Sequence, residues 1–105
     1  MEELSEDRFG SFIGENSCAL VDFFAPWCGP CRAMGPAVES IAEEFAGRAA
    51  VGKVDVDRCP ALAERFAIRS IPTLIFFRDG EVVETLTGAR SKEELVRKLA
   101  AHVRV

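Results

Sequence analysis

One apolar segment, residues 19–25, constrains the fold more than any other part of the sequence. Hydrophobic residues occupy both of its alternating faces, and the one exception is Asp22. A strand with this pattern is covered on both sides, as in the parallel sheets of layered α/β proteins. We therefore expect a central strand between helices, with a carboxyl group buried in it.

Capping residues and apolar spacing predict one helix before this strand and one after it. The first helix is short and begins after Ser5, an N-cap residue. The second runs from Cys31 to about Ala46, and Pro36 inside it is expected to bend it. Residues 49–56 then form a second strand, which a right-handed crossover places parallel to the first.

The next part of the chain changes from a helix to a hairpin. Asp57 is expected to cap a third helix that runs through Phe66. Residues 74–77 and 82–86 flank the turn residues 79–80, a pattern typical of two antiparallel strands.

A final helix closes the chain and completes the order of elements. Ser91 and Glu94 stand three residues apart, as in a capping box. Helices thus alternate with strands until the hairpin, which predicts an α/β layer arrangement with a mixed central sheet. The 105 residues suffice for a single domain, residues 1–105.

Charge and composition exclude several classes of partner. Thirteen Lys and Arg against seventeen Asp and Glu give a net charge of -4, the wrong sign for binding nucleic acid. The frequent charges also exclude a membrane span. The acidic amino terminus lacks the basic start and apolar run of an export signal, so we expect a cytoplasmic protein.

Two of the four cysteines, Cys28 and Cys31, form a close pair where the central strand gives way to a helix. Cys28 falls at or near the N-cap, where unpaired N–H groups and the helix dipole favour thiolate, so it is the expected nucleophile. Cys31 lies about one turn further on the same face and can attack a mixed disulfide formed at Cys28. Gly29 and Pro30 add no charge or proton donor between the sulfurs, which favours a reducing couple over an oxidising one.

The segment Trp27–Cys31, preceded by Ala25 and Pro26, resembles the active-site motif of the thioredoxin family. The resemblance covers nearly the whole chain and includes Asp22, Pro36, Lys53, Ile71 to Thr73, Asp79 with Gly80, and Thr87 to Ala89. It implies the thioredoxin fold, a three-layer α/β/α arrangement with a mixed central β-sheet of four to five strands and four flanking helices. The chain before Ser5 is too short for a full first strand, so we expect that edge strand to be short or absent.

Asp22 and Lys53 are the expected proton-handling residues. An ionised carboxylate inside a covered strand costs several kcal/mol, and burial raises its pKa toward values that suit proton transfer at neutral pH. The resemblance implies that Asp22 deprotonates the resolving Cys31 and that Lys53, on the neighbouring strand, is its partner. The alternatives are a purely structural carboxylate and a solvated strand lysine.

The resemblance also implies a client-binding rim around Cys28. Pro72 opens a strand, a position that tolerates proline, and its peptide bond is expected to be cis and to face the cysteines. Ile71 would then offer its backbone to an extended client segment. The expected rim residues are Trp27, Ile71, Pro72, Gly88 and Ala89.

These features indicate a thiol–disulfide oxidoreductase, a protein-disulfide reductase that acts on disulfide-containing client proteins. We expect a monomer that binds no cofactor or metal, whose redox centre is the Cys28–Cys31 disulfide, re-reduced by a thioredoxin reductase. The alternatives are an oxidase or isomerase, a non-catalytic binding or scaffold module, and a zinc-binding module in which Cys18 and Cys59 complete four ligands. Cys18 and Cys59 are expected to be core residues, and a redox role for Cys59 stays open.

Overall fold

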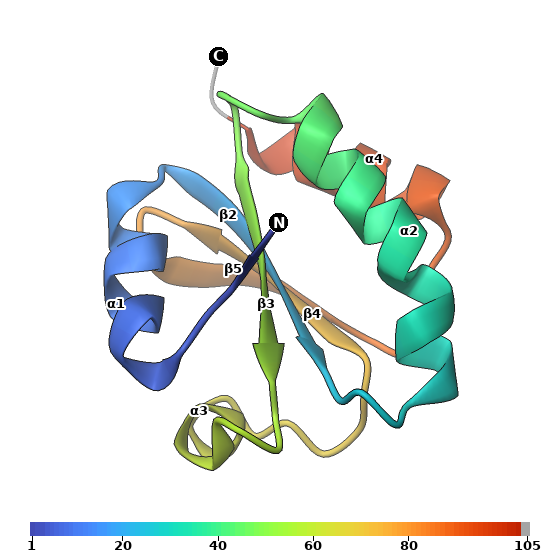
Figure 1. Ribbon diagram of the computed structural model, residues 1–105. Helices are drawn as coiled ribbons and strands as arrows, with labels where there is room; N and C mark the ends of the chain where they lie inside the picture. Colours follow the sequence, from blue (N-terminus) through green and yellow to red (C-terminus); the bar gives the residue numbers. More distant parts are fainter. Residues whose placement is uncertain (104–105) are drawn as a thin grey trace.

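A mixed five-stranded sheet forms the middle layer of the protein, and helices cover both of its faces (Figure 1). The computed structural model describes residues 1–103. Along the chain the elements are β1 (Glu2–Glu3), α1 (Glu6–Glu15), β2 (Cys18–Phe24), α2 (Gly29–Glu44), β3 (Ala50–Asp55), α3 (Pro60–Arg65), β4 (Thr73–Arg78), β5 (Glu81–Thr87) and α4 (Lys92–His102). The strand order across the sheet is β1-β3-β2-β4-β5, so β2 is the central strand and the expected α/β/α layering is confirmed.

The register of β2 places Asp22 in the middle of the sheet. β2 runs parallel to β3 and antiparallel to β4. Asp22 lies opposite Lys53 on β3 and Leu74 on β4. Because side chains alternate along a strand, Leu20 and Phe24 share the face of Asp22.

Two hydrophobic cores hold the helices on the sheet. The α1/α3 core lies between one face and helices α1 and α3, and its side chains include Phe9, Phe12, Ile13, Val21, Phe23, Val54, Leu62, Ile75 and Phe77. The α2/α4 core lies on the other face, with Leu20, Met34, Val38, Ile41, Leu74, Phe76, Leu95 and Leu99. β2 contributes alternate residues to the two cores, which explains its unbroken apolar sequence.

The first edge strand is present but short, as expected. β1 has two residues, paired in parallel with Gly52 and Lys53 of β3, and Leu4 N–H donates to the Lys53 carbonyl at 2.8 Å. The Leu4 side chain packs so closely that a Cβ on Gly52 would lie 3.0 Å from Leu4 Cδ1. Glycine at position 52 therefore lets Leu4 seal the edge of the core.

The starts of two helices differ from the sequence prediction. α2 begins at Gly29, directly after Cys28, and continues through Pro36 as one helix. The prediction that Asp57 caps the third helix is wrong, because Cys59 stands at the N-cap of α3 and Pro60 opens the helix. Asp57 belongs to the preceding turn, where its N–H donates to Asp55 Oδ1 at 2.9 Å.

The capping box of α4 is formed in part. Ser91 Oγ accepts a hydrogen bond from the Glu94 N–H at 3.2 Å, as the spacing predicts. The Glu94 carboxylate pairs with Arg90 at 2.9 Å, so a neighbouring cation takes the place of the Ser91 backbone as its partner.

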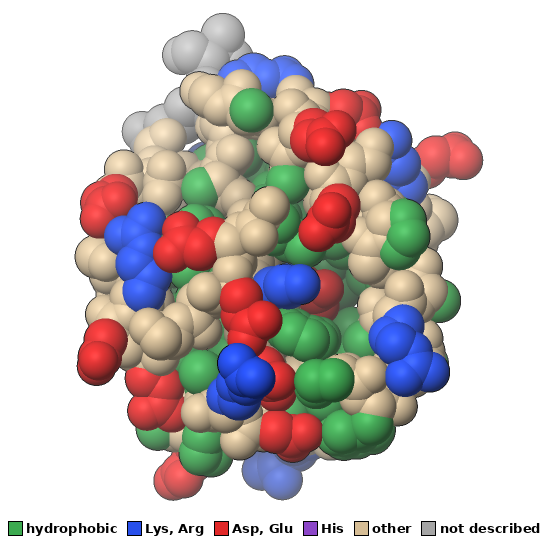
Figure 2. Space-filling model, viewed as in Figure 1, with side chains coloured by type: hydrophobic (Ala, Val, Ile, Leu, Met, Phe, Trp, Pro, Cys, Tyr) green, Lys and Arg blue, Asp and Glu red, His purple; other side chains and the backbone are tan. Residues whose placement is uncertain are grey.

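Acidic and basic side chains are interspersed over the surface seen in Figure 2. Hydrophobic side chains gather toward the lower right of this view, where β2 leads into α2 in Figure 1. Trp27, on that connection, is 67% exposed, the largest fraction among the bulky hydrophobic side chains of the described residues. No helix within residues 1–103 has both the length and the apolar character needed to cross a bilayer.

Candidate active site

Cys28 is the N-cap residue of α2. Its backbone is extended, with φ -81° and ψ 115°, and its sulfur accepts a hydrogen bond from the Cys31 N–H at 3.2 Å. The sulfur also lies 4.0 Å from the Ile71 carbonyl oxygen. One backbone donor, the Cys31 N–H, and the positive end of the α2 dipole therefore face this sulfur, while the Ile71 carbonyl can accept the Cys28 S–H.

Cys31 lies in the first turn of α2, and both cysteines are 5% exposed. Burial, with smaller contributions from Cys28 and Asp22, raises the pKa of the Cys31 thiol to about 12. This thiol is therefore protonated at neutral pH and needs a base before it can act as a nucleophile. The two sulfurs thus differ in chemistry although they sit three residues apart.

Asp22 supplies a carboxyl group on the α2 side of the sheet. It is 4% exposed, and Oδ1 is buried with no hydrogen-bond partner in the described part of the chain. Burial raises the pKa of Asp22 to about 6, and the charge of Lys53 opposes the rise. The carboxyl group therefore changes protonation state near neutral pH.

Lys53 faces Asp22 from the neighbouring strand but acts on it through charge alone. Its ammonium nitrogen lies 5.3 Å from the centroid of the Phe24 ring, a cation–π contact. No ion pair within 4.0 Å joins it to Asp22 in the described structure. The resemblance predicted a partnership, and the structure gives a neighbouring charge that leaves Oδ1 free.

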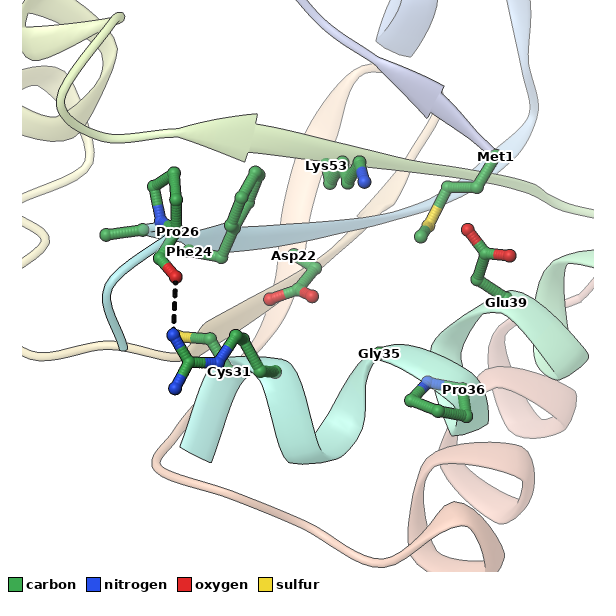
Figure 3. A pocket seen from close by; sticks show the side chains of 11 residues that line it. Met1, Asp22, Phe24, Pro26, Cys31, Gly35, Pro36, Glu39 and Lys53 are labelled. Atoms are coloured by element: carbon green, nitrogen blue, oxygen red, sulfur yellow. Dashed lines mark hydrogen bonds between the residues drawn. The ribbon is translucent and has the colours of Figure 1, made fainter. Parts of the chain in front are cut away.

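A cavity of about 560 Å³ lies between α2 and the sheet and reaches both Asp22 and Cys31. Figure 3 shows the Asp22 carboxylate pointing into it, with Lys53 on the strand above and Glu39 near Met1 at one end. Cys28 is not among the residues that line it. The Asp22 carboxyl group and the Cys31 thiol therefore share a space that the Cys28 sulfur does not line.

Four of the expected rim residues, Trp27, Ile71, Pro72 and Gly88, are linked by contacts or a shared groove near Cys28. The Ile71–Pro72 peptide bond is cis, and Gly88, at φ +92°, donates its N–H to the Pro72 carbonyl at 2.8 Å. Ile71 packs against the small cluster that contains Cys28. Pro72 is buried, whereas Ala89 is exposed.

Trp27 is held over this rim by a contact that sequence reasoning missed. Its indole N–H donates to Asp57 Oδ2 at 2.8 Å. A groove of about 310 Å³, lined in part by Trp27, Val56, Arg69 and Ile71, runs beside it. The turn position of Asp57 gave the signal for a capping role, and only the folded chain shows that its carboxylate reaches the indole.

The other two cysteines lie apart from this site. Cys18 is in the α2/α4 core and Cys59 in the α1/α3 core, and all four cysteines are free thiols. The described residues contain no group of three or more His, Cys, Asp or Glu side chains placed to hold a metal ion. The structure therefore offers no support for the zinc alternative.

Comparisons with known proteins identify the family and the fold. A family model described as thioredoxin matches residues 1–101. The thioredoxin of Chlamydia caviae is 42% identical over 99 residues, which cover 94% of this chain and 95% of that protein. Thioredoxin 1 of Synechococcus elongatus is 48% identical over 84 residues, which cover 80% of this chain and 78% of that protein. Among solved structures, a mutant thioredoxin from Halobacterium salinarum has a TM-score of 0.93 at 35% identity and covers 99% of this chain and 91% of its own. The Plasmodium falciparum thioredoxin has a TM-score of 0.87, also at 35% identity, with 93% and 98% covered.

Proposed function

Because the chain belongs to the thioredoxin family of thiol–disulfide oxidoreductases, we propose that it reduces client disulfides through a Cys28/Cys31 dithiol–disulfide cycle. The difference between the two thiols carries this proposal. Cys28 caps a helix and accepts the Cys31 N–H, whereas Cys31 is a buried thiol with a raised pKa next to Asp22.

In the first step the Cys28 thiolate attacks one sulfur of the client disulfide. A bond forms between Cys28 and that sulfur while the client's S–S bond breaks, and the second client sulfur leaves as a thiolate that takes a proton from water. The N-cap position of Cys28 supports this role, because the helix terminus stabilises the thiolate that attacks.

In the second step Asp22 accepts the proton of the Cys31 thiol, directly or through water. The Cys31 thiolate attacks Cys28, the bond between Cys28 and the client breaks, and the client sulfur that Cys28 held leaves as a thiolate, so both client sulfurs are now reduced. Two electrons have then passed to the client, and a Cys28–Cys31 disulfide remains. A carboxyl group with a pKa of about 6 is suited to accept this proton and return it.

The client is proposed to bind as an extended segment on the rim formed by Trp27, Ile71, Pro72, Gly88 and Ala89. Main-chain groups of Ile71 would pair with the client backbone, which explains how one site accepts many sequences. The exposed indole of Trp27 adds an apolar contact beside the sulfur.

We further propose that the cycle uses no bound cofactor and that a thioredoxin reductase returns the Cys28–Cys31 disulfide to the dithiol. The protein would act as a monomer in the cytoplasm. Gly29 and Pro30 lack charges and proton donors, which supports reduction as the direction of transfer. A measured potential near about -120 mV, that of a strong oxidant, would instead assign an oxidase.

Reduction of insulin disulfides, followed as precipitation, tests the cycle with matched serine variants. Cys28→Ser should abolish activity, and Cys31→Ser should accumulate a stable mixed disulfide with the client. Cys59→Ser, a change at a cysteine outside the site, should keep wild-type activity. Full activity of Cys28→Ser, or no mixed disulfide with Cys31→Ser, would contradict the assigned roles.

A further inference from the structure

The cavity behind Cys31 has the size and lining of a small-molecule site. Its volume of about 560 Å³ falls in the range of ligand pockets, roughly 300–1,000 Å³. Phe24, Pro26 and Pro36 give it apolar walls. Charged side chains also line it, those of Asp22, Arg32, Glu39 and Lys53. Figure 3 shows these side chains around an open space between the sheet and α2.

One polar atom in this cavity lacks a partner. Asp22 Oδ1 is buried and accepts no hydrogen bond in the described structure, and the side chain points into the cavity. A buried acceptor without a donor is costly, and the cost is greater when the group is ionised. A ligand that brings a donor to Oδ1 therefore gains more than it would at an exposed carboxylate.

Two carboxylates and two cations line the cavity, and the charge of Lys53 acts on Asp22. Lys53 is held over the Phe24 ring and Arg32 donates to the Pro26 carbonyl at 3.1 Å, so neither cation donates a hydrogen bond to Asp22 Oδ1 in the described structure. Glu39 adds a second carboxylate to the lining. The cavity thus combines flat apolar walls with two carboxylates that a cation could face.

We propose that this cavity binds a small organic cation with a flat apolar body, an aromatic amidine or amine, whose N–H groups donate to Asp22 Oδ1. The apolar body lies between Phe24 and Pro36, and the cationic group lies at the floor beside Cys31. The cavity is separate from the rim that faces clients, since Cys28, Ile71 and Pro72 do not line it.

The bound cation would act on one half of the cycle, a consequence that rests on the proposed function. It occupies the space shared by Asp22 and Cys31, so it holds the carboxylate that must take the Cys31 proton. Cys28 lies outside the cavity and keeps its access to client disulfides. Occupancy therefore slows resolution of the mixed disulfide and leaves its formation unchanged.

Binding is tested with benzamidine as the probe, by titration of the reduced protein at about pH 7 and two-dimensional NMR. We expect saturable shifts confined to amides around the cavity, with a dissociation constant on the order of a millimolar. Asp22→Asn should weaken binding by about tenfold or more, since it removes a charged hydrogen bond. Benzamide, a neutral probe of the same shape, should bind the wild type more weakly by a similar factor.

A pair of glycine variants tests the position of the site. A Cβ on Gly35, which lines the cavity, or on Gly10, on the exposed side of α1, meets no atom within 4 Å. Gly35→Leu should fill the cavity and abolish binding, whereas Gly10→Leu should leave it unchanged. If Gly35→Leu does not fold, Gly35→Val replaces it. A cavity that holds only water, shown by the absence of saturable shifts, would overturn the proposal, as would equal affinity of Asp22→Asn.

Kinetics then test the consequence. At ten times its dissociation constant, benzamidine leaves about one molecule in eleven free, so resolution by Cys31 should slow about tenfold. Mixed-disulfide formation at Cys28, measured with Cys31→Ser, should change less than about twofold. Equal slowing of both steps would refute the separation. A wild-type protein without reductase activity would refute the proposed function and leave the binding titration valid.

Discussion

Replacing Asp22 by Asn should make the protein more stable and less active. The side chain is 4% exposed, and burial raises its pKa from 3.8 to about 6. The difference between these two pKa values corresponds to about 3 kcal/mol of unfolding free energy at a pH well above 6. Asn keeps the shape and removes the charge, so the variant should gain about 2 to 3 kcal/mol at pH 7.

The gain should depend on pH in a defined direction. A carboxyl group whose pKa is higher in the folded protein stabilises the fold only while it is protonated. For Asp22 this contribution is complete below about pH 4 and is lost as the pH rises through 6. Urea denaturation of both reduced proteins should therefore give nearly equal stabilities at about pH 4 and the full difference at pH 7.

Asp55→Asn is the matched control for this measurement. Asp55 is also 4% exposed, but its Oδ1 accepts the Asp57 N–H at 2.9 Å. Asn can still accept this N–H, but its oxygen is neutral and the pairing of Asp55 with Arg58 at 3.9 Å is lost, so the fold should be destabilised by about 1 kcal/mol. A pH-independent gain for Asp22→Asn, or a loss like that of the control, would refute the assignment of a costly, unpaired carboxylate.

Activity should change in the opposite sense to stability. Without the carboxylate, Cys31 must lose its proton to solvent, and removal of a positioned base lowers rates by about a hundredfold or more. Rapid-mixing measurements of client release at pH 7 should show this loss, while attack by Cys28 stays near the wild-type rate. Unchanged release would show that Asp22 is a structural carboxylate.

Three further predictions concern other parts of the molecule. Gly35→Ala should raise the unfolding free energy by about 0.5 to 1 kcal/mol, because the new Cβ meets no atom within 4 Å in the helix. Gly80→Ala should lower the unfolding free energy, because φ at Gly80 is +82°, a conformation that alanine rarely adopts; urea denaturation measures both changes. Iodoacetamide at pH 7 should label Cys28 much faster than Cys31, because burial raises the pKa of the Cys31 thiol to about 12, and equal labelling by mass spectrometry would contradict the proposed roles. Lys98 and His102 of α4 lower the pKa of Glu84, so the Glu84 carboxylate stabilises the fold above pH 4.5 and ceases to do so as the pH falls. Glu84→Gln should therefore lower the free energy of unfolding by at most about 1 kcal/mol at low salt, and by less at high salt.

Local patterns sufficed to predict most of the fold. Ser5 and Ser91 cap their helices as their spacing indicates, and both side chains accept the expected backbone N–H. The apolar run of β2 required two covering layers, and the structure has them. β1 has two residues and lies at the edge of the sheet, next to β3. In each case neighbours in sequence decide the outcome.

The features that the sequence did not reveal depend on contacts between distant segments. Asp57 looks like a cap, yet it accepts the indole N–H of Trp27, thirty residues earlier in the chain. The cavity depends on the missing side chain of Gly35 on α2 and on the positions of Met1 and of Lys53 on β3, which also line it. Lys53 was placed correctly opposite Asp22, but its cation–π contact with Phe24 follows from side-chain packing.

The alternation of side chains along β2 explains why the proposed base, Asp22, faces the helix that carries Cys31. Leu20 packs in the α2/α4 core, whereas Val21 and Phe23 pack in the α1/α3 core. Asp22 therefore faces α2, whose first turn carries Cys31 on its buried side. A shift of one residue between β2 and its neighbours would place an apolar side chain at this position and turn the carboxylate toward α1 and α3. The apolar residues that fix the register of the sheet thus also fix the position of the base.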